Sequence, residues 1–189
     1  MRRPLLVTLV VAATLGHFAL WARAILWFPA LPERFPIHFN AAGTPDGWST
    51  NPAAWFLLPG IALALTLFLG GIARWSASLA RNAPALFNVP RKELFLKLSP
   101  EGRARVAAPT QAFLAWMLVL LHALFLYILE GSARVAVGSA QVLPSWPVFV
   151  FLGCVFATLP FYLIATIKVV DRCAAEEGLL IGAAGPRAR

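Results

Sequence analysis

Residues 34–48, RFPIHFNAAGTPDGW, bring an imidazole, an amide and a carboxylate together in a short polar stretch between two apolar runs. These groups belong to His38, Asn40 and Asp46, and Gly43 and Gly47 accompany them. A protein metal site usually takes three or four ligands, so one imidazole and one carboxylate do not indicate a metal ion. Two main interpretations stay open: a hydrogen-bonded cap over the ends of neighbouring elements, or a site that binds a peptide or small ligand.

Two further histidines lie inside apolar segments, where ionisable side chains are rare. His17 and His122 lie at similar distances from the beginnings of their segments, so we expect them at nearly the same depth in a membrane. Such a pair could hold a ligand or relay a proton. The alternative is that each ring stays neutral and bonds a backbone carbonyl or a hydroxyl group, such as those of Thr14, Thr66 and Thr158.

Arg23 and Glu130 lie near the far ends of the same two apolar segments. We expect an ion pair between them beneath the polar stretch, although each side chain is long enough to reach the membrane surface alone.

The composition identifies the class of protein that must position these groups. The chain has 189 residues, of which 60% are hydrophobic and 13% charged, and its mean hydropathy is +0.75. A soluble domain needs a more polar surface, so these values indicate a membrane protein. The net charge of +8 lies beside apolar segments and not along a polar face, which favours anionic lipid headgroups over nucleic acid as the partner. Cys154 and Cys173 have no metal-ligand spacing and predict no disulfide framework.

Four segments are long enough to cross a bilayer, which takes about 20 mostly apolar residues. We therefore predict an all-α integral membrane protein with a single membrane domain over residues 1–189. Its four transmembrane helices lie at about 4–28, 53–73, 110–130 and 146–170. The start of the chain allows a second interpretation, because Ala22-Arg23-Ala24 resembles a signal-peptide cleavage site. The apolar run continues through Phe28, however, so we expect a span there.

The distribution of basic residues predicts the orientation. The connection 74–109 holds seven basic and two acidic residues, whereas the connection 29–52 holds Glu33, Arg34 and Asp46. Positive residues stay on the cytoplasmic side, so we expect the loop 74–109, both termini and the tail 171–189 to be cytoplasmic. The loop 29–52 then lies outside the cytoplasm.

Within that outer loop we expect a small hairpin-like hook. Residues 36–40 alternate, so that Ile37 and Phe39 point one way and His38 and Asn40 the other, as in a short strand. Residues 44–47, TPDG, are typical of a tight turn, in which Gly47 supplies a positive backbone angle.

The basic loop suggests contact with lipid or with a cytoplasmic regulator. Residues 91–98 mix leucine and phenylalanine with basic side chains, which favours a short helix on anionic headgroups. Ser99 and Pro100 then predict a helix start, and Pro109 should kink or divide that helix from the third span. The residues that we expect to make the lipid or partner contacts are Asn88, Pro90, Arg91, Lys92 and Lys97.

The stretch 31–48, LPERFPIHFNAAGTPDGW, resembles the signature loop of a bacterial membrane family, domain of unknown function 1648. The pattern of that family, L-P-x-x-x-P-x-H-F-N-x-x-G-x-x-D-G, falls here on Leu31, Pro32, Pro36, His38, Phe39, Asn40, Gly43, Asp46 and Gly47. Residues 87–103 also resemble the cytoplasmic stretch of small family members, with Asn88, Pro90 and Lys92 in matching places. The resemblance implies a role like that of the larger proteins that begin with this domain. Those proteins give sporulating bacteria immunity to a secreted killing factor and relay its presence to a repressor.

Motifs for catalysis are missing from the sequence. It contains no G-x-S-x-G, no H-E-x-x-H and no phosphate-binding glycine loop, so we expect neither catalytic residues nor a cofactor. Our first hypothesis is a protein that senses or binds an extracytoplasmic ligand through the hook. The alternative is a small channel or transporter subunit that uses the membrane histidines, in which a second copy of the chain would supply the other half.

Overall fold

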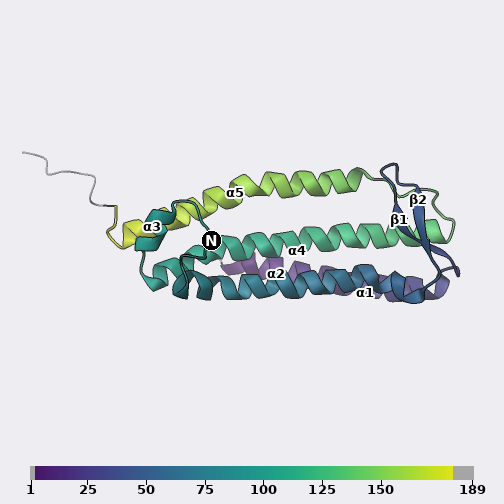
Figure 1. Ribbon diagram of the computed structural model, residues 1–189, viewed down its shortest axis with the longest axis horizontal. Helices are drawn as coiled ribbons and strands as arrows, with labels where there is room; N and C mark the ends of the chain where they lie inside the picture. The colour runs from purple at the N-terminus through teal and green to yellow at the C-terminus, as the bar shows by residue number, and fades with distance from the viewer. Residues whose placement is uncertain (1–2, 181–189) are drawn as a thin grey trace, which may run out of the picture.

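The computed structural model describes residues 3–180 and is an elongated bundle of long helices that run side by side (Figure 1). Four of its helices are long and apolar enough to cross a membrane: α1 (Arg3–Trp27), α2 (Leu57–Asn82), α4 (Pro100–Ala136) and α5 (Trp146–Glu176). The predicted fold class, an all-α protein with four transmembrane helices, is confirmed. The chain is therefore a multi-pass membrane protein.

The two ends of the bundle differ in character. One end carries strands β1 (Phe35–Phe39) and β2 (Pro45–Ser49) together with the α4–α5 connection, and we name it the hairpin end (Figure 1). The other carries the α2–α4 connection with the short helix α3 (Lys92–Lys97), and we name it the basic end. Two single 3₁₀ segments, η1 (Phe28–Ala30) and η2 (Pro52–Phe56), join the hairpin to α1 and α2.

Three of the helices extend beyond the predicted spans. α2 continues past residue 73 to Asn82, α4 covers Pro100–Ala136 where 110–130 was predicted, and α5 continues past residue 170 to Glu176. Hydropathy locates the stretch that a bilayer core can hold, but arginine, glutamate and alanine are good helix formers beyond that core. Only residues 177–180 of the predicted tail lie after α5 in the described part of the chain, and residues 181–189 lie outside it.

The sequence predicted that Pro109 would either kink or divide the helix, and the structure shows that it does not divide α4. The helix is continuous through Pro109, whose side chain is buried. A proline inside a helix removes one hydrogen bond, and packing against neighbouring helices can compensate for that loss in a membrane. The predicted start of the helix is confirmed, because the Ser99 hydroxyl accepts a hydrogen bond from the Gly102 N–H at 3.1 Å and Pro100 follows at the first helical position.

Tight packing is concentrated at the two ends of the bundle. At the hairpin end, Leu20 and Ala24 of α1 pack with Trp55 and with Leu129 of α4, and the Trp55 indole donates to the Ala24 carbonyl at 2.9 Å. At the basic end, Phe95 of α3 is fully buried in a second cluster with α4 and α5. Between these clusters, large apolar side chains of α1, α2 and α5 face outward, as they do on helices that contact lipid.

Candidate functional site

The hairpin is fixed to the helices by apolar and backbone contacts. Phe35 is buried and meets the Trp55 ring edge-to-face, with ring centres 5.9 Å apart. At the tip, the Leu143 N–H donates to the Gly43 carbonyl at 2.8 Å, which ties the hairpin to the α4–α5 connection. These contacts hold both ends of the hairpin, so the side chains between them are presented from a rigid support.

The turn of the hairpin lies at residues 40–43, and the prediction of a turn at residues 44–47 is wrong. The Asn40 side chain accepts hydrogen bonds from the N–H groups of Ala42 and Thr44, at 2.9 and 3.0 Å. Gly43 has φ +78°, in the left-handed region that favours glycine. Asn40 is therefore a turn-forming residue in this structure.

Gly47 has a different role from the predicted one. It lies in β2, and positive φ among the glycines of residues 3–180 occurs at Gly43, Gly138 and Gly178. A Cβ atom at Gly47 would lie 2.7 Å from the Cβ of His38, the residue opposite it. Gly47 is therefore needed because it has no side chain that would collide with His38. A positive φ is not needed at this position.

His38 and Asp46 form the polar face of the hairpin. The register of β1 and β2 has irregularities on both sides of His38, which leave Ile37 and Asp46 without opposite residues. Such irregularities redirect side chains. Here they break the predicted alternation, because Ile37 and His38 are both exposed, and they bring His38 Nδ1 to 2.5 Å from the Asp46 carboxylate. The two side chains are 71% and 43% exposed, so the pair faces the surroundings of the protein.

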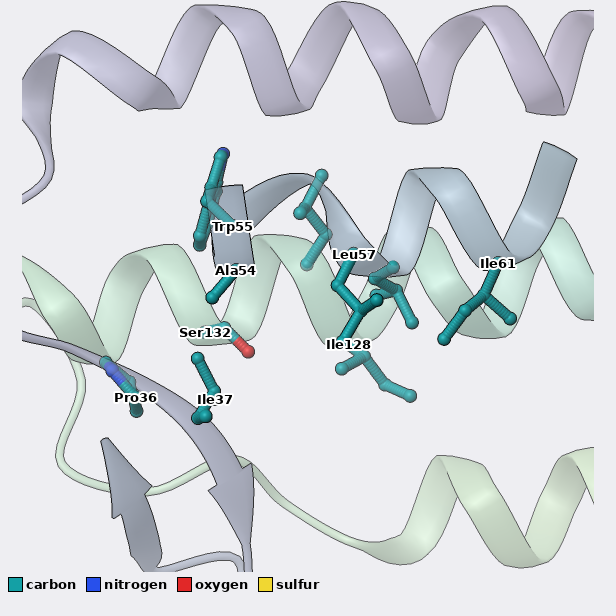
Figure 2. A pocket seen from close by; sticks show the side chains of 10 residues that line it. Pro36, Ile37, Ala54, Trp55, Leu57, Ile61, Ile128 and Ser132 are labelled. Carbon is teal, nitrogen blue, oxygen red and sulfur yellow. The ribbon is translucent and has the colours of Figure 1, made fainter. Parts of the chain in front are cut away.

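An apolar groove lies beside this polar face. It has a volume of about 240 Å³. Strand β1, the start of α2 and α4 surround it, as Figure 2 shows. Ile37, Leu57 and Ile128 line it, and the Ser132 hydroxyl is a polar group on its wall. Ile37 is 53% exposed at the edge of the groove and immediately precedes His38 in the chain. A ligand could therefore contact the apolar groove and the His38–Asp46 pair together.

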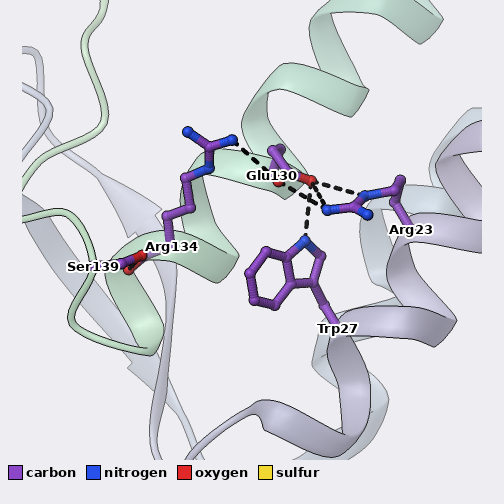
Figure 3. Close-up of polar contacts among 5 residues, drawn as sticks. All are labelled: Arg23, Trp27, Glu130, Arg134 and Ser139. Carbon is purple, nitrogen blue, oxygen red and sulfur yellow. Dashed lines mark hydrogen bonds and ion pairs between the residues drawn. The ribbon is translucent and has the colours of Figure 1, made fainter.

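Arg23 and Glu130 form an ion pair that joins α1 to α4 below the hairpin (Figure 3). The guanidinium group reaches both carboxylate oxygens at 2.8–3.0 Å, and the Trp27 indole donates to the same carboxylate at 3.0 Å. Arg134, one turn further along α4, lies 3.5 Å from it. Sequence reasoning predicted the pairing of Arg23 with Glu130 but missed Trp27 and Arg134. Trp27 lies four residues after Arg23, and Arg134 lies four residues after Glu130. Residues four apart are neighbours on the surface of a helix, so this spacing could have indicated both contacts.

His17 and His122 meet in the middle of the bundle. His17 Nδ1 lies 3.1 Å from His122 Nε2, and Thr66 Oγ1 of α2 lies 3.2 Å from the same nitrogen. His122 Nδ1 lies 2.6 Å from the Leu118 carbonyl, so that nitrogen carries a hydrogen and donates it. In a neutral His122 ring, Nε2 is then the acceptor, and His17 Nδ1–H is the matching donor. The structure thus brings together the two histidines and one of the threonines considered as partners, and their functional role stays a prediction.

The basic-loop residues divide into two groups. Lys92 donates to the carbonyl groups of Pro84, Ala85 and Phe87, and Arg91 pairs with Asp171 at 3.0 Å. Both are therefore engaged with the protein, as is the apolar side of α3, where Phe95 is buried. The other predicted contact residues keep more freedom: Asn88 and Lys97 are exposed and Pro90 is half-buried. One side of α3 packs on α5, and contact of its exposed side with lipid headgroups stays a prediction.

Sequence reasoning missed a carboxylate that joins two helices at the basic end. Glu177, just after α5, accepts hydrogen bonds from the Ser99 N–H and the Ser99 hydroxyl, both at 2.7 Å. These two bonds lower the pKa of Glu177 below its ordinary value because they favour the charged carboxylate. The contact joins the N-terminus of α4 to the end of α5, and no local pattern links residues so far apart in the chain.

Comparison with protein families gives a match that covers the hairpin and its flanking helix segments. Residues 15–63 match the model of a family described as "Domain of unknown function (DUF1648)". The resemblance predicted from the signature loop is therefore confirmed. The DUF1648 match contains His17, the Arg23 end of α1, the whole hairpin and the start of α2. Neither the curated proteins nor the solved structures provide a match to the chain.

Proposed function

We propose that the protein is a non-catalytic membrane protein that binds an extracytoplasmic peptide or small ligand through the hairpin, residues 35–49. It would lie in the inner membrane of a bacterium, with both termini and the basic end in the cytoplasm. The excess of basic residues in the α2–α4 connection supports this orientation.

One observation carries the proposal: the residues that anchor the hairpin differ from those that form its polar face. Phe35 and Gly43 make the contacts to the helices and to the α4–α5 connection. His38 and Asp46 bond each other and remain exposed. A cap over the helix ends would use these polar groups to satisfy helix termini. Exposed and rigidly held groups suit recognition of a ligand better, because little conformational entropy is lost on binding.

The side chains of the hairpin and of the adjoining groove indicate the chemistry of the ligand. His38 and Asp46 offer an imidazole and a carboxylate, and the adjoining groove offers apolar walls with Ile37 at its edge. A peptide with an apolar side chain next to a basic side chain or a free amino terminus matches this surface, because it fills the groove and pairs with the carboxylate. The immunity or signalling role implied by the DUF1648 resemblance would also require a cytoplasmic regulator as a partner. Helix α4 would connect the ligand to that regulator, because it reaches from the hairpin end to the basic end as one helix.

Thermal melting of the purified protein in detergent tests the proposal, with and without a concentrated peptide fraction from the culture medium. A ligand that binds the folded state raises the melting temperature. We expect this rise for the parent protein and its loss in His38→Ala and Asp46→Asn, with melting in the absence of the fraction nearly unchanged. Glu33→Gln removes an exposed carboxylate of the same loop outside the hairpin and should keep the rise. A large drop in stability without the fraction, and no rise with it, would instead identify the pair as a structural cap.

A second candidate function is proton movement through the membrane, which the 3.1 Å contact of His17 with His122 favours. A proton on this pair could pass between α1 and α4 along that hydrogen bond. Proteoliposomes that contain a pH-sensitive dye test it under an imposed membrane potential. Proton entry that His122→Leu abolishes and Asp46→Asn leaves intact would favour this candidate over ligand binding.

A further inference from the structure

We propose that the cavity between α1, α2 and α4 near the basic end binds an anionic phospholipid, with its headgroup at Arg74 and one acyl chain inside. The cavity has a volume of about 450 Å³. It lies far from the hairpin, so the proposal does not depend on the proposed function.

The walls of the cavity are apolar over most of its length. Val10 and Ala13 of α1 line one wall, Gly70 of α2 another, and Ala115 and Leu118 of α4 the third. Cavities with walls of this kind exclude water and accept apolar ligands. An acyl chain from the surrounding bilayer is the apolar ligand present at the highest concentration.

The polar groups of the cavity lie at its two ends. Thr66 closes the deep end, where its hydroxyl donates to the Ala62 carbonyl at 2.7 Å and approaches His122. Arg74 and Gln111 lie at the opposite end, next to the loop with the excess of basic residues. Along α2, the eight-residue separation of Thr66 from Arg74 corresponds to about 12 Å. The cavity therefore runs inward from the membrane surface, which is the direction of a phospholipid chain.

The charge at the mouth selects the headgroup. Arg74 is exposed, and within residues 3–180 no carboxylate forms a salt bridge with it. It follows directly on the predicted apolar span that ends at residue 73, so it lies at the level of lipid headgroups. A guanidinium group there binds a phosphate with parallel hydrogen bonds and attracts a headgroup of net negative charge. An anionic lipid thus matches both the mouth and the interior.

Native mass spectrometry with two lipids of identical chains tests the proposal. Phosphatidylglycerol carries a net negative charge and phosphatidylcholine does not. We expect the parent protein to retain phosphatidylglycerol in preference, and Arg74→Gln to reduce that preference about fivefold. Arg81→Gln removes an exposed arginine of the same helix that does not line the cavity, and should retain the preference. Equal behaviour of the two variants would overturn the assignment of the headgroup.

Two adjacent glycines provide a matched test of the interior. A Cβ atom would meet nothing within 4 Å at either Gly70 or Gly71, but only Gly70 belongs to the residues that line the cavity. Gly70→Leu should fill the space and reduce retention of both lipids, whereas Gly71→Leu should bind them like the parent protein. Both variants should melt like the parent in lipid-free detergent. Retention by Gly70→Leu at the level of the parent would show that no chain occupies the cavity.

Discussion

The contact between Gly43 and the backbone at residue 143 predicts a large cost for a single methyl group. Gly43 and Gly138 have almost the same positive φ, at +78° and +75°. A Cβ atom at Gly43 would lie 1.9 Å from the Leu143 carbonyl oxygen, whereas one at Gly138 would meet nothing within 4 Å. The two alanine variants therefore share the strain of the left-handed conformation and differ in the collision.

The magnitudes can be worked out from these differences. Alanine in the left-handed region costs about 1–2 kcal/mol, and the stiffer unfolded chain offsets about 0.4–1 kcal/mol of it. Gly138→Ala should therefore lower the free energy of unfolding by about 1 kcal/mol. In Gly43→Ala the hairpin tip must also move away and lose the hydrogen bond from the Leu143 N–H, which contributes about 0.5–1.5 kcal/mol. We expect a total of about 2–3 kcal/mol for Gly43→Ala when the steric displacement is included.

Denaturation in mixed micelles, followed by tryptophan fluorescence, measures both variants against the parent protein. Limited proteolysis adds a local measurement, because a hairpin released at its tip is cleaved faster than an anchored one. We expect faster cleavage within residues 40–50 in Gly43→Ala and not in Gly138→Ala. Equal stability losses and equal cleavage rates would refute the claim that the tip is anchored to the α4–α5 connection.

Three further predictions concern contacts between helices. Glu177 has a lowered pKa in the folded protein, so its contribution to stability is present at neutral pH and is lost as the pH falls through that pKa. When the melting temperature is measured at decreasing pH, it should therefore fall less for Glu177→Gln than for the parent protein. Identical dependence on pH in the two proteins would contradict the contact of Glu177 with Ser99. Gly16→Leu should cost about 1–3 kcal/mol in the same denaturation assay, because a Cβ at Gly16 already lies 3.0 Å from the Cβ of His122; a neutral effect would show that α1 and α4 are further apart. Trp27→Phe removes the hydrogen bond from the Trp27 indole to the half-buried Glu130 carboxylate and should cost about 1.5 kcal/mol in the same assay; an unchanged free energy of unfolding would contradict this hydrogen bond.

Much of the architecture could be predicted because two simple physical rules govern it. Apolar length locates the spans, and α1 (Arg3–Trp27) lies within one residue of the predicted 4–28. The same counting of residues along helices predicted one depth for His17 and His122 and a common end of the spans for Arg23 and Glu130, since a rise of about 1.5 Å per residue converts sequence position into depth. Helix ends were less predictable, because hydropathy does not register helix beyond the bilayer core.

The details of the candidate site depended on contacts between distant residues. Both 40–43 and 44–47 contain turn-forming residues, and the contact of Gly43 with Leu143 distinguishes them only after the fold has formed. The pairing of His38 with Asp46 depends on strand irregularities that no alternation rule contains. Likewise, Lys92 has the composition of a lipid contact, yet it binds backbone carbonyls of its own loop.

The central claim, that the hairpin is presented to the extracytoplasmic solution, can be tested by labelling single cysteines in intact cells. Thr50 lies just after β2 and is exposed, and Asn88 is exposed in the loop of the basic end. In a background without the two native cysteines, Thr50→Cys should react with a membrane-impermeant thiol reagent, and Asn88→Cys should react only after the cells are permeabilised. Labelling of Asn88→Cys in intact cells, with Thr50→Cys protected, would reverse the orientation and remove the hairpin from the compartment in which its ligand is proposed to be.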